Sequence, residues 1–300
     1  MDVGPSASII DSDNARLMKL GAYASIGVAT TLILIKVTAW LMTNSISLLS
    51  SLVDSLMDML ASTITLLSIG YAVKPADKEH RFGHGKMEAL GSLTQAAIIS
   101  GSAVFLCLES IERFVHPAQI RNGRVGIAVM LISILLTLGL VGFQRHVVRR
   151  TGSLAVDSDK LHYLGDLLMN ASVIVSLLLS QWLGWTWIDP VFGMLIAIFI
   201  LSSVYNIGRN ALNMLMDREF PDEERKKILN IIEGFGEVIG VHDLRTRSSG
   251  PISFIQFHLE LDGNLKLEQA HAISDRVMHA VEADFPNSEV LVHQDPVQDK

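Results

Sequence analysis

The sequence is poor in cysteine and in charged residues. Its 300 residues include one cysteine, Cys107, and only 18% are charged, whereas a soluble domain carries about 25%. A single cysteine excludes an intrachain disulfide and a thiolate cluster, so any metal site must use nitrogen and oxygen ligands. The hydrophobic content of 49% and the mean hydropathy of +0.38 are too high for an ordinary soluble chain or a disordered one.

An excess of basic residues is also lacking, because the formal net charge is −7. This balance gives no indication of a nucleic-acid partner. The acidic excess lies at one end: residues 1–210 carry 15 basic and 14 acidic side chains, and residues 211–300 carry 9 and 17. We therefore expect a long apolar domain followed by a short acidic one, with the boundary near Asp217.

Six apolar stretches have the length that crosses a bilayer as a helix, about 20 residues. They cover residues 20–43, 46–73, 89–115, 125–144, 161–183 and 187–210. A soluble all-helical core is the alternative, and six such stretches in one chain argue against it. The sequence therefore predicts a six-helix transmembrane domain at 17–212, between an N-terminal tail at 1–16 and a soluble domain at 213–300.

Basic residues gather in alternate connections between these stretches. The N-terminal arm and the connections at 74–88 and 145–160 contain Lys and Arg, whereas those at 44–45 and 184–186 contain neither. The connection at 116–124, with two arginines, is a mild exception. Because basic loops stay in the cytoplasm, this pattern predicts a multi-pass protein with both termini there.

Ionisable residues inside membrane spans are costly and are functional candidates. Asp54 and Asp58 are four residues apart in the second span, so their carboxylates share one helical face. His162 and Asp166 repeat this spacing in the fifth span. Together they offer three carboxylates and one imidazole, which suits tetrahedral Zn²⁺ and also accommodates Fe²⁺ or Co²⁺.

A purely structural role for these four residues is the alternative. It would need basic partners, and Lys36, the basic residue deep in a span, cannot neutralise three carboxylates. Carboxylates packed together without metal repel one another, so protons should replace the metal when it leaves. This is the chemistry of a metal/proton antiporter. Leu161, next to His162, is a candidate apolar gate, and ordinary packing explains it equally well.

The connection at 74–88 contains a second candidate site. Asp77, His80 and His84 could supply three ligands, with water completing the coordination. The alternative is a solvated loop of mixed charge.

The acidic end predicts a small domain of order αββαβ. Its elements are expected at 221–233, 238–247, 252–261, 267–284 and 288–293. His258 alternates with buried positions and therefore lies on the outer face of its strand. His293 and Asp295 share one side of the last strand. With a histidine from the partner strand of the hairpin they form a candidate zinc site, whereas scattered surface histidines are the alternative.

Several segments together resemble the cation diffusion facilitator family, and bacterial zinc/proton antiporters of that family in particular. The resemblance covers the chain from about residue 17 to residue 296. It is carried by these segments: Ser-Leu-Val-Asp54-Ser-Leu-Met-Asp58, Phe82-Gly-His84-Gly-Lys86, Leu161-His162-Tyr-Leu-Gly-Asp166, Val241-His242-Asp-Leu-Arg-Thr-Arg, Phe254-Ile-Gln-Phe-His258 and His293-Gln-Asp295-Pro296.

The resemblance implies a homodimer in the bacterial cytoplasmic (inner) membrane, with six helices per subunit and a metallochaperone-like αββαβ domain in the cytoplasm. Such a protein is a transporter of Zn²⁺, or of Fe²⁺, Cd²⁺ or Co²⁺, and not an enzyme. The implied roles are a transport site at Asp54, Asp58, His162 and Asp166; a loop site at Asp77, His80 and His84; a two-metal site at His242, His258, His271, His293 and the bridging Asp295; and a dimer-hinge salt bridge between Lys86 and Asp217.

Three other functions remain open at this point. A membrane metal sensor would bind zinc without flux, and a gated channel would conduct without coupling to a pH gradient. A membrane metalloprotease would need a general base beside the metal, as in His-Glu-x-x-His. That motif does not occur in the sequence.

Overall fold

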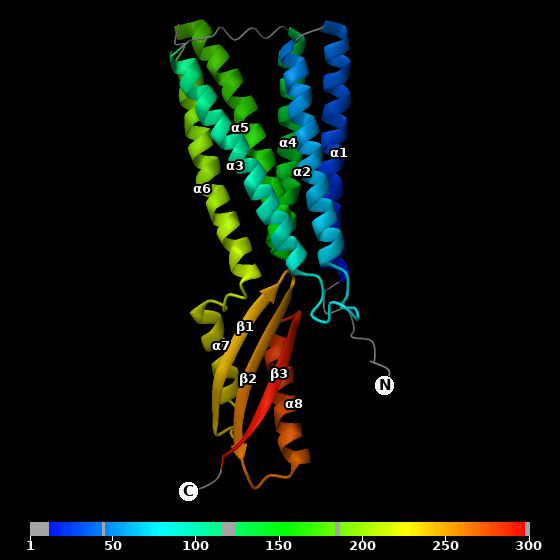
Figure 1. Cartoon of the computed structure of the whole chain (residues 1–300), viewed down its shortest axis with the longest axis vertical. Helices are drawn as coiled ribbons and strands as arrows, with labels where there is room; N and C mark the ends of the chain where they lie inside the picture. Colours follow the sequence, from blue (N-terminus) through cyan, green and yellow to red (C-terminus); the bar gives the residue numbers. More distant parts are fainter. Residues whose placement is uncertain (1–11, 44–45, 116–123, 184–186, 298–300) are drawn as a thin grey trace. The chain divides into compact units, whose positions relative to one another are not determined.

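The computed structural model describes residues 12–43, 46–115, 124–183 and 187–297 (Figure 1). These residues divide into two compact units. A helical unit contains Arg16–Ala72 and Met87–Leu212, and an α/β unit contains Val73–Lys86 and the chain from Asn213 onward. The segment between the second and third helices thus clusters with the C-terminal domain, although sequence places it between two membrane spans.

The helical unit is formed by six long helices, α1 to α6, among the described residues (Figure 1). Five of them are long and apolar enough to cross a membrane by length and composition, judged on the described residues. The other, α5, carries His162 and Asp166 of the predicted transport site. The helices are α1 (Ser12–Thr43), α2 (Ile46–Ala72), α3 (Lys86–Val115), α4 (Arg124–Thr151), α5 (Leu154–Leu183) and α6 (Ile188–Leu215).

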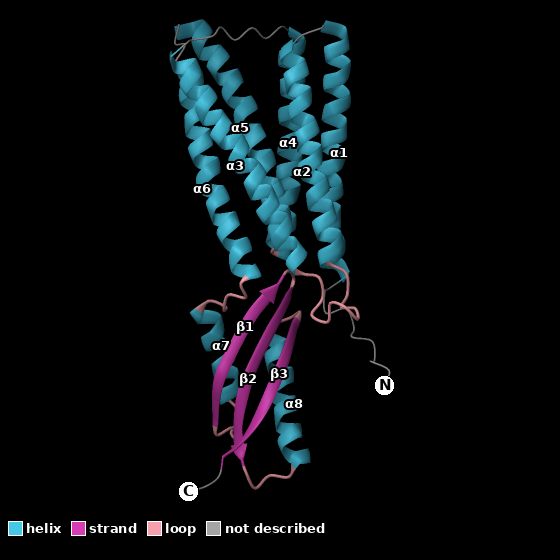
Figure 2. Cartoon of the chain, viewed as in Figure 1, coloured by secondary structure: helices cyan, strands magenta, loops and turns pink. Residues whose placement is uncertain are grey.

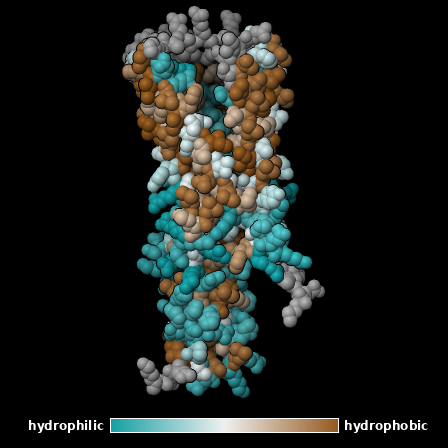
Figure 3. Space-filling model, viewed as in Figure 1, coloured by the Kyte–Doolittle hydropathy of each residue, from teal (hydrophilic) through white to brown (hydrophobic). Residues whose placement is uncertain are grey.

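The face of the helical unit seen in Figure 3 is largely apolar. Phe105 on α3 and Leu135 on α4 are 67% and 69% exposed. Buried positions include many polar side chains, among them Ser25, Gln95 and Gln144. This distribution is expected for helices surrounded by lipid and confirms the predicted membrane domain.

The connection predicted at 145–160 is much shorter in the structure. Helix α4 continues to Thr151, and α5 begins at Leu154. Gly152 adopts a φ of +66° and donates its N–H to the carbonyl of Val148, which ends α4. The Ser153 hydroxyl then accepts the N–H of Val156 and caps α5. The charged residues that indicated a loop therefore lie on helical turns.

The α/β unit has two helices on one sheet of three strands (Figure 2). Strand β1 pairs with β2 in antiparallel fashion, and β2 pairs with β3 in parallel. The predicted order αββαβ is confirmed, and β3 extends beyond the predicted end at 293. The elements are α7 (Asp222–Glu233), β1 (Gly240–Ser249), β2 (Ile252–Asp262), α8 (Leu267–Asp284) and β3 (Ser288–Val297).

The core of this domain lies between the helices and one face of the sheet. Alternate residues of β2, including Ile255, Phe257 and Leu259, are at most 1% exposed and pack on Ile228 of α7 and Val277 of α8. The intervening β2 side chains consequently point to the other face. That face carries the histidines considered below.

Candidate metal sites

The first ligand group lies inside the helical unit. Asp58 of α2 and His162 and Asp166 of α5 offer ligand atoms that all lie within 4.8 Å of one another. His162 Nε2 is 2.9 Å from Asp58 Oδ1 and 3.9 Å from Asp166 Oδ2. The spacing of four residues places both α5 side chains on the face that meets α2.

The environment of this group favours a cation. Asp166 Oδ2 is buried and has no hydrogen-bond partner. Lys36 of α1 is buried, but its ammonium group donates to the Ser51 carbonyl at 3.0 Å and to Ser55 Oγ at 2.6 Å. A tetrahedral zinc ion separates its ligand atoms by about 3.4 Å, so small side-chain adjustments would let this set hold the ion.

Two further predicted residues lie beside this group. Asp54 is exposed on α2, one turn before Asp58, and is outside the set of converging ligand atoms. Leu161 is 5% exposed and belongs to an apolar cluster with residues of α3 and α6, including Ile99 and Ile200. The structure thus places Leu161 in a packed position and does not bring Asp54 to the other ligands.

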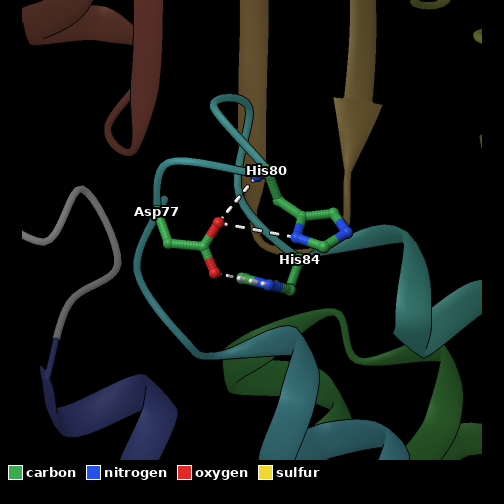
Figure 4. Close-up of side chains that lie close together, drawn as sticks. All are labelled: Asp77, His80 and His84. Carbon is green, nitrogen blue, oxygen red and sulfur yellow. Dashed lines mark hydrogen bonds and ion pairs between the residues drawn. The ribbon is translucent and has the colours of Figure 1, made fainter.

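The second ligand group lies in the loop between α2 and α3 (Figure 4). Asp77 Oδ1 is 3.5 Å from His80 Nδ1, and Asp77 Oδ2 is 3.4 Å from His84 Nε2. The backbone N–H groups of Glu79 and His80 donate to Asp77 Oδ1 at 2.9 and 2.7 Å. The His80 N–H is the main cause that lowers the pKa of Asp77, so its carboxylate stays ionised and available to a metal.

The third ligand group crosses the outer face of the sheet. His242 pairs with His258 in the β1–β2 register, and His258 pairs with His293 in the β2–β3 register. The ring centroids are 5.1 and 4.5 Å apart along this row. Strand pairing therefore aligns three histidines that are widely separated in sequence.

Asp295 faces all three histidines of this row. Its Oδ2 is 2.8 Å from His258 Nδ1 and 3.3 Å from His242 Nε2, and its Oδ1 is 3.3 Å from His293 Nε2. The hydrogen bond from His258 is the main cause that lowers the pKa of Asp295. A carboxylate whose two oxygens face different histidines has the arrangement needed to bridge two metal ions.

The predicted ligand His271 is not part of this row. It lies on α8, where its side chain is 69% exposed and its Nε2 is 3.4 Å from Asp275 Oδ2. Two acidic neighbours were not predicted: Glu260 Oε1 is 3.0 Å from His242 Nδ1, and Asp243 Oδ2 is 3.8 Å from His258 Nε2. Strand alternation places Glu260, two residues after His258, on the same face of the strand, but gives no sign that it contacts His242.

The predicted pair of Lys86 and Asp217 is close in the structure. Lys86 Nζ is 2.9 Å from Asp217 Oδ1 and also donates to the Leu215 carbonyl at the end of α6. Arg247 lies nearby, 3.5 Å from Asp217 Oδ2, with its guanidinium group 4.8 Å from the Phe82 ring and 4.7 Å from the Phe254 ring. These contacts connect the loop to the sheet within the α/β unit.

A polar cluster around Asp159 was also missed. Asp159 is fully buried in the helical unit, three residues before His162. The fifth span was expected to begin at residue 161, which excluded Asp159, whereas α5 begins at Leu154. The spacing from His162 is the signal that could have revealed it.

Comparisons with known proteins give two family matches and close relatives. Residues 22–216 match the cation efflux transmembrane domain, and residues 220–297 match the cytoplasmic domain of cation efflux proteins. Cation-efflux pump FieF of Klebsiella pneumoniae is 49% identical over 281 residues, which cover 94% of this chain and 93% of the relative. FieF of Salmonella paratyphi A is 48% identical over 281 residues, which again cover 94% of this chain and 93% of the relative.

A solved structure also matches part of the chain. The metal-bound C-terminal domain of the CzcD transporter from Thermotoga maritima is 24% identical. The match covers 26% of this chain and 91% of that chain, with a TM-score of 0.25.

Proposed function

Because the chain belongs to the cation efflux family, whose members are metal-cation transporters and not enzymes, we propose that it exports Zn²⁺ in exchange for protons. The ion would be bound by Asp54, Asp58, His162 and Asp166 and released by alternating access. The observation that carries this proposal is the buried ligand group between α2 and α5, with one carboxylate oxygen left without a hydrogen-bond partner.

Exchange with protons follows from the composition of the group. Its carboxylates lie close together in a buried site, so their mutual repulsion must be offset by a cation. Zn²⁺ and protons can each supply that charge, and neutral imidazole binds Zn²⁺ whereas imidazolium does not. Loss of the metal therefore favours uptake of protons by the same side chains.

Asp54 is the proposed fourth ligand. It lies one turn before Asp58 and is exposed, whereas the other three ligands have converged. A movement of α2 relative to α5 would change the number of ligands around the ion, which is a way to bind it in one access state and release it in the other. Leu161, packed beside the group, is the proposed gate.

The α/β unit is the proposed cytoplasmic dimerisation domain. Its row of three histidines around Asp295 fits one or two zinc ions, and Asp77, His80 and His84 fit another. His271 would join the row from α8, and the Lys86–Asp217 pair would brace the dimer hinge. Bound metal would offset the repulsion among acidic side chains in this domain and so stabilise the homodimer.

The proposed location is the bacterial cytoplasmic membrane, with both termini in the cytoplasm. Six helices return the chain to the side on which it starts, and the basic connections lie on that same side.

Zinc flux in sealed proteoliposomes tests the proposal. An imposed pH gradient should accelerate flux, and protons should move in the opposite direction. Flux that ignores the gradient would contradict antiport and favour a channel. Tight zinc binding without flux would contradict transport and favour a sensor.

A further inference from the structure

The Asp159 cluster joins five helices around one buried carboxylate. Asp159 Oδ2 accepts hydrogen bonds from Ser25 of α1 and from Gln144 Nε2 of α4, at 2.5 and 2.7 Å. Asp159 Oδ1 accepts from Gln95 Nε2 of α3 at 3.3 Å. Two hydroxyls of α2, Ser62 and Thr65, lie 3.3 and 3.5 Å from the same oxygen.

Within the described parts of the chain, no Lys, Arg or His nitrogen lies within ion-pair distance of the Asp159 carboxylate, and His162 interacts with it electrostatically from further away. A buried carboxylate without a counter-ion is very costly unless hydrogen bonds satisfy it. Five polar groups from four other helices lie within 3.5 Å of its two oxygens and meet that need here. Asp159 therefore fixes the position of these helices along the bundle axis and their rotation about their own axes.

Two buried glutamine amides lie beside the carboxylate. Gln95 and Gln144 are 1% and 0% exposed. Gln144 Nε2 donates to Asp159 at 2.7 Å, whereas Gln95 Nε2 donates to the Ala61 carbonyl at 2.9 Å and lies 3.3 Å from Asp159 Oδ1. Their carbonyl oxygens, in contrast, are buried without a hydrogen-bond partner. Gln144 leaves its acceptor unsatisfied while its donor reaches the carboxylate, as expected if Asp159 determines the orientation of this amide.

The cluster lies one turn from the ligands on both helices that carry them. Ser62 follows Asp58 by four residues, and Asp159 precedes His162 by three, so the separations along the helix axes are about 6 Å and about 4.5 Å. Tyr163, directly after His162, bridges the two helices: its hydroxyl is 2.9 Å from Ser62 Oγ and donates to the Ser25 carbonyl at 3.3 Å. Any shift of α5 against α2 at the cluster would displace His162 from Asp58.

We propose that Asp159 is a positioning residue of the transport site, which fixes α5 against α2 so that His162 and Asp166 meet Asp58. This inference rests on the proposed transport function. It assigns to Asp159 no contact with the ion, because the hydrogen-bond cluster reaches the ligands only through the helices.

The test compares Asp159→Ala, Asp159→Asn and Ser158→Ala in the full-length protein, using zinc flux in proteoliposomes to obtain KM and maximal rate. Loss of the carboxylate should raise the KM for zinc by about tenfold or more, the range for groups that support metal ligands. Asparagine keeps one acceptor, and a rotated glutamine amide can accept from its NH₂ group, so Asp159→Asn should restore KM to within about threefold. Ser158→Ala removes a hydroxyl that donates to the Leu154 carbonyl of its own helix and takes no part in the Asp159 cluster as described, so it should change neither value.

A merely structural role would reduce the number of active molecules, which lowers the maximal rate and leaves KM unchanged. That result for Asp159→Ala would overturn the proposal, as would an Asp159→Asn protein with the same raised KM as the alanine variant. If Asp159→Ala does not fold, Ser62→Ala and Tyr163→Phe replace it: a severalfold rise in KM supports the proposal, and an unchanged KM refutes it. Asp58→Ala tests the transport site separately, since full flux in that variant contradicts the proposed function whatever Asp159 does.

Discussion

The two units of this protein place polar and apolar side chains in opposite ways. In the helical unit, buried polar residues such as Gln95, Gln144 and Asp159 connect helices whose outer surfaces are apolar. In the α/β unit, Phe257 and its neighbours form an apolar core, and the titratable histidines lie on the outer face of the sheet. Lipid removes the hydrophobic drive for helices to associate, so polar contacts gain weight, whereas water drives apolar burial in the second unit.

The same contrast separates their metal groups. The side chains of His162 and Asp58 are 10% and 13% exposed, and that of Asp166 is 38% exposed with its Oδ2 atom buried. Those of His242 and Asp295 are 48% and 33% exposed. A buried group must exchange its ion for another charge, but an exposed group can be solvated when the ion leaves. The buried group is therefore suited to coupled transport and the exposed one to stabilisation by metal.

The sharpest way to test this division is Asp58→Ala. We expect zinc flux in proteoliposomes to fall to background, because the converging ligand group loses one of its three members, while metal bound by the α/β unit is retained. Asp157→Asn is the matched control, since Asp157 is a carboxylate of α5 that pairs with Lys160 outside the ligand group. Flux near the original rate in Asp58→Ala would show that the ion takes another route.

The apolar core of the second unit can be tested with Phe257→Ala. Removing this buried ring should lower the free energy of unfolding of the domain by about 3–5 kcal/mol. Hydrogen exchange of residues 220–297 in the full-length protein measures the change. Leu291→Ala, at a position 62% exposed on β3, should stay within about 0.5 kcal/mol. Equal effects of the two variants would contradict the core described here.

The row of histidines is tested by His258→Ala. Zinc retained by the full-length protein after dialysis should fall, because Asp295 loses its nearest imidazole, while flux at saturating zinc should stay within about threefold of the original. His279→Ala is the control, since His279 lies on α8 and bonds the backbone of its own helix. Abolished flux in His258→Ala would show that the two units are not separate in function.

A smaller effect is expected at the pair of Glu237 and Arg276, whose atoms are 2.8 Å apart. The hydrogen bond from Arg276 lowers the pKa of Glu237, so the pair stabilises the folded domain above the ordinary carboxyl pKa. This stabilisation should be lost as the pH falls through the lowered pKa of Glu237.

Hydrogen exchange of the α/β unit in Glu237→Gln measures this effect. The variant should differ from the original protein near neutral pH and match it at acidic pH, whereas Glu282→Gln, on the helix that carries Arg276, should not show this pattern. A difference that grows with acidity would contradict the assignment.

Much of the architecture follows from local patterns in the sequence. Apolar length predicts the membrane helices, alternation predicts which face of β2 is buried, and the turn residues between β1 and β2 predict their hairpin. The predicted ends of elements were less accurate, as at the start of α5. There the capping residue Ser153 precedes the charged residues, which therefore lie within the helix.

For the candidate sites too, some features could be predicted from local sequence and others could not. Spacing within one element is a local property, so the pairs Asp54 with Asp58 and His162 with Asp166 could be read directly. Which members converge depends on how separate helices pack, and the structure unites Asp58 with the α5 pair while Asp54 stays apart. His271 likewise depends on the orientation of α8 and lies outside the row of histidines.

The sequence by itself determined the membrane class, the domain order and the chemical types of the ligands, because these depend on composition and on the fixed periods of helix and strand. Only the tertiary structure decided the alignment of His242, His258 and His293, the placement of the α2–α3 loop with the C-terminal domain, and the five-helix contacts of Asp159. These features join residues far apart in the chain, and strand register and helix rotation are set by the packing of whole elements.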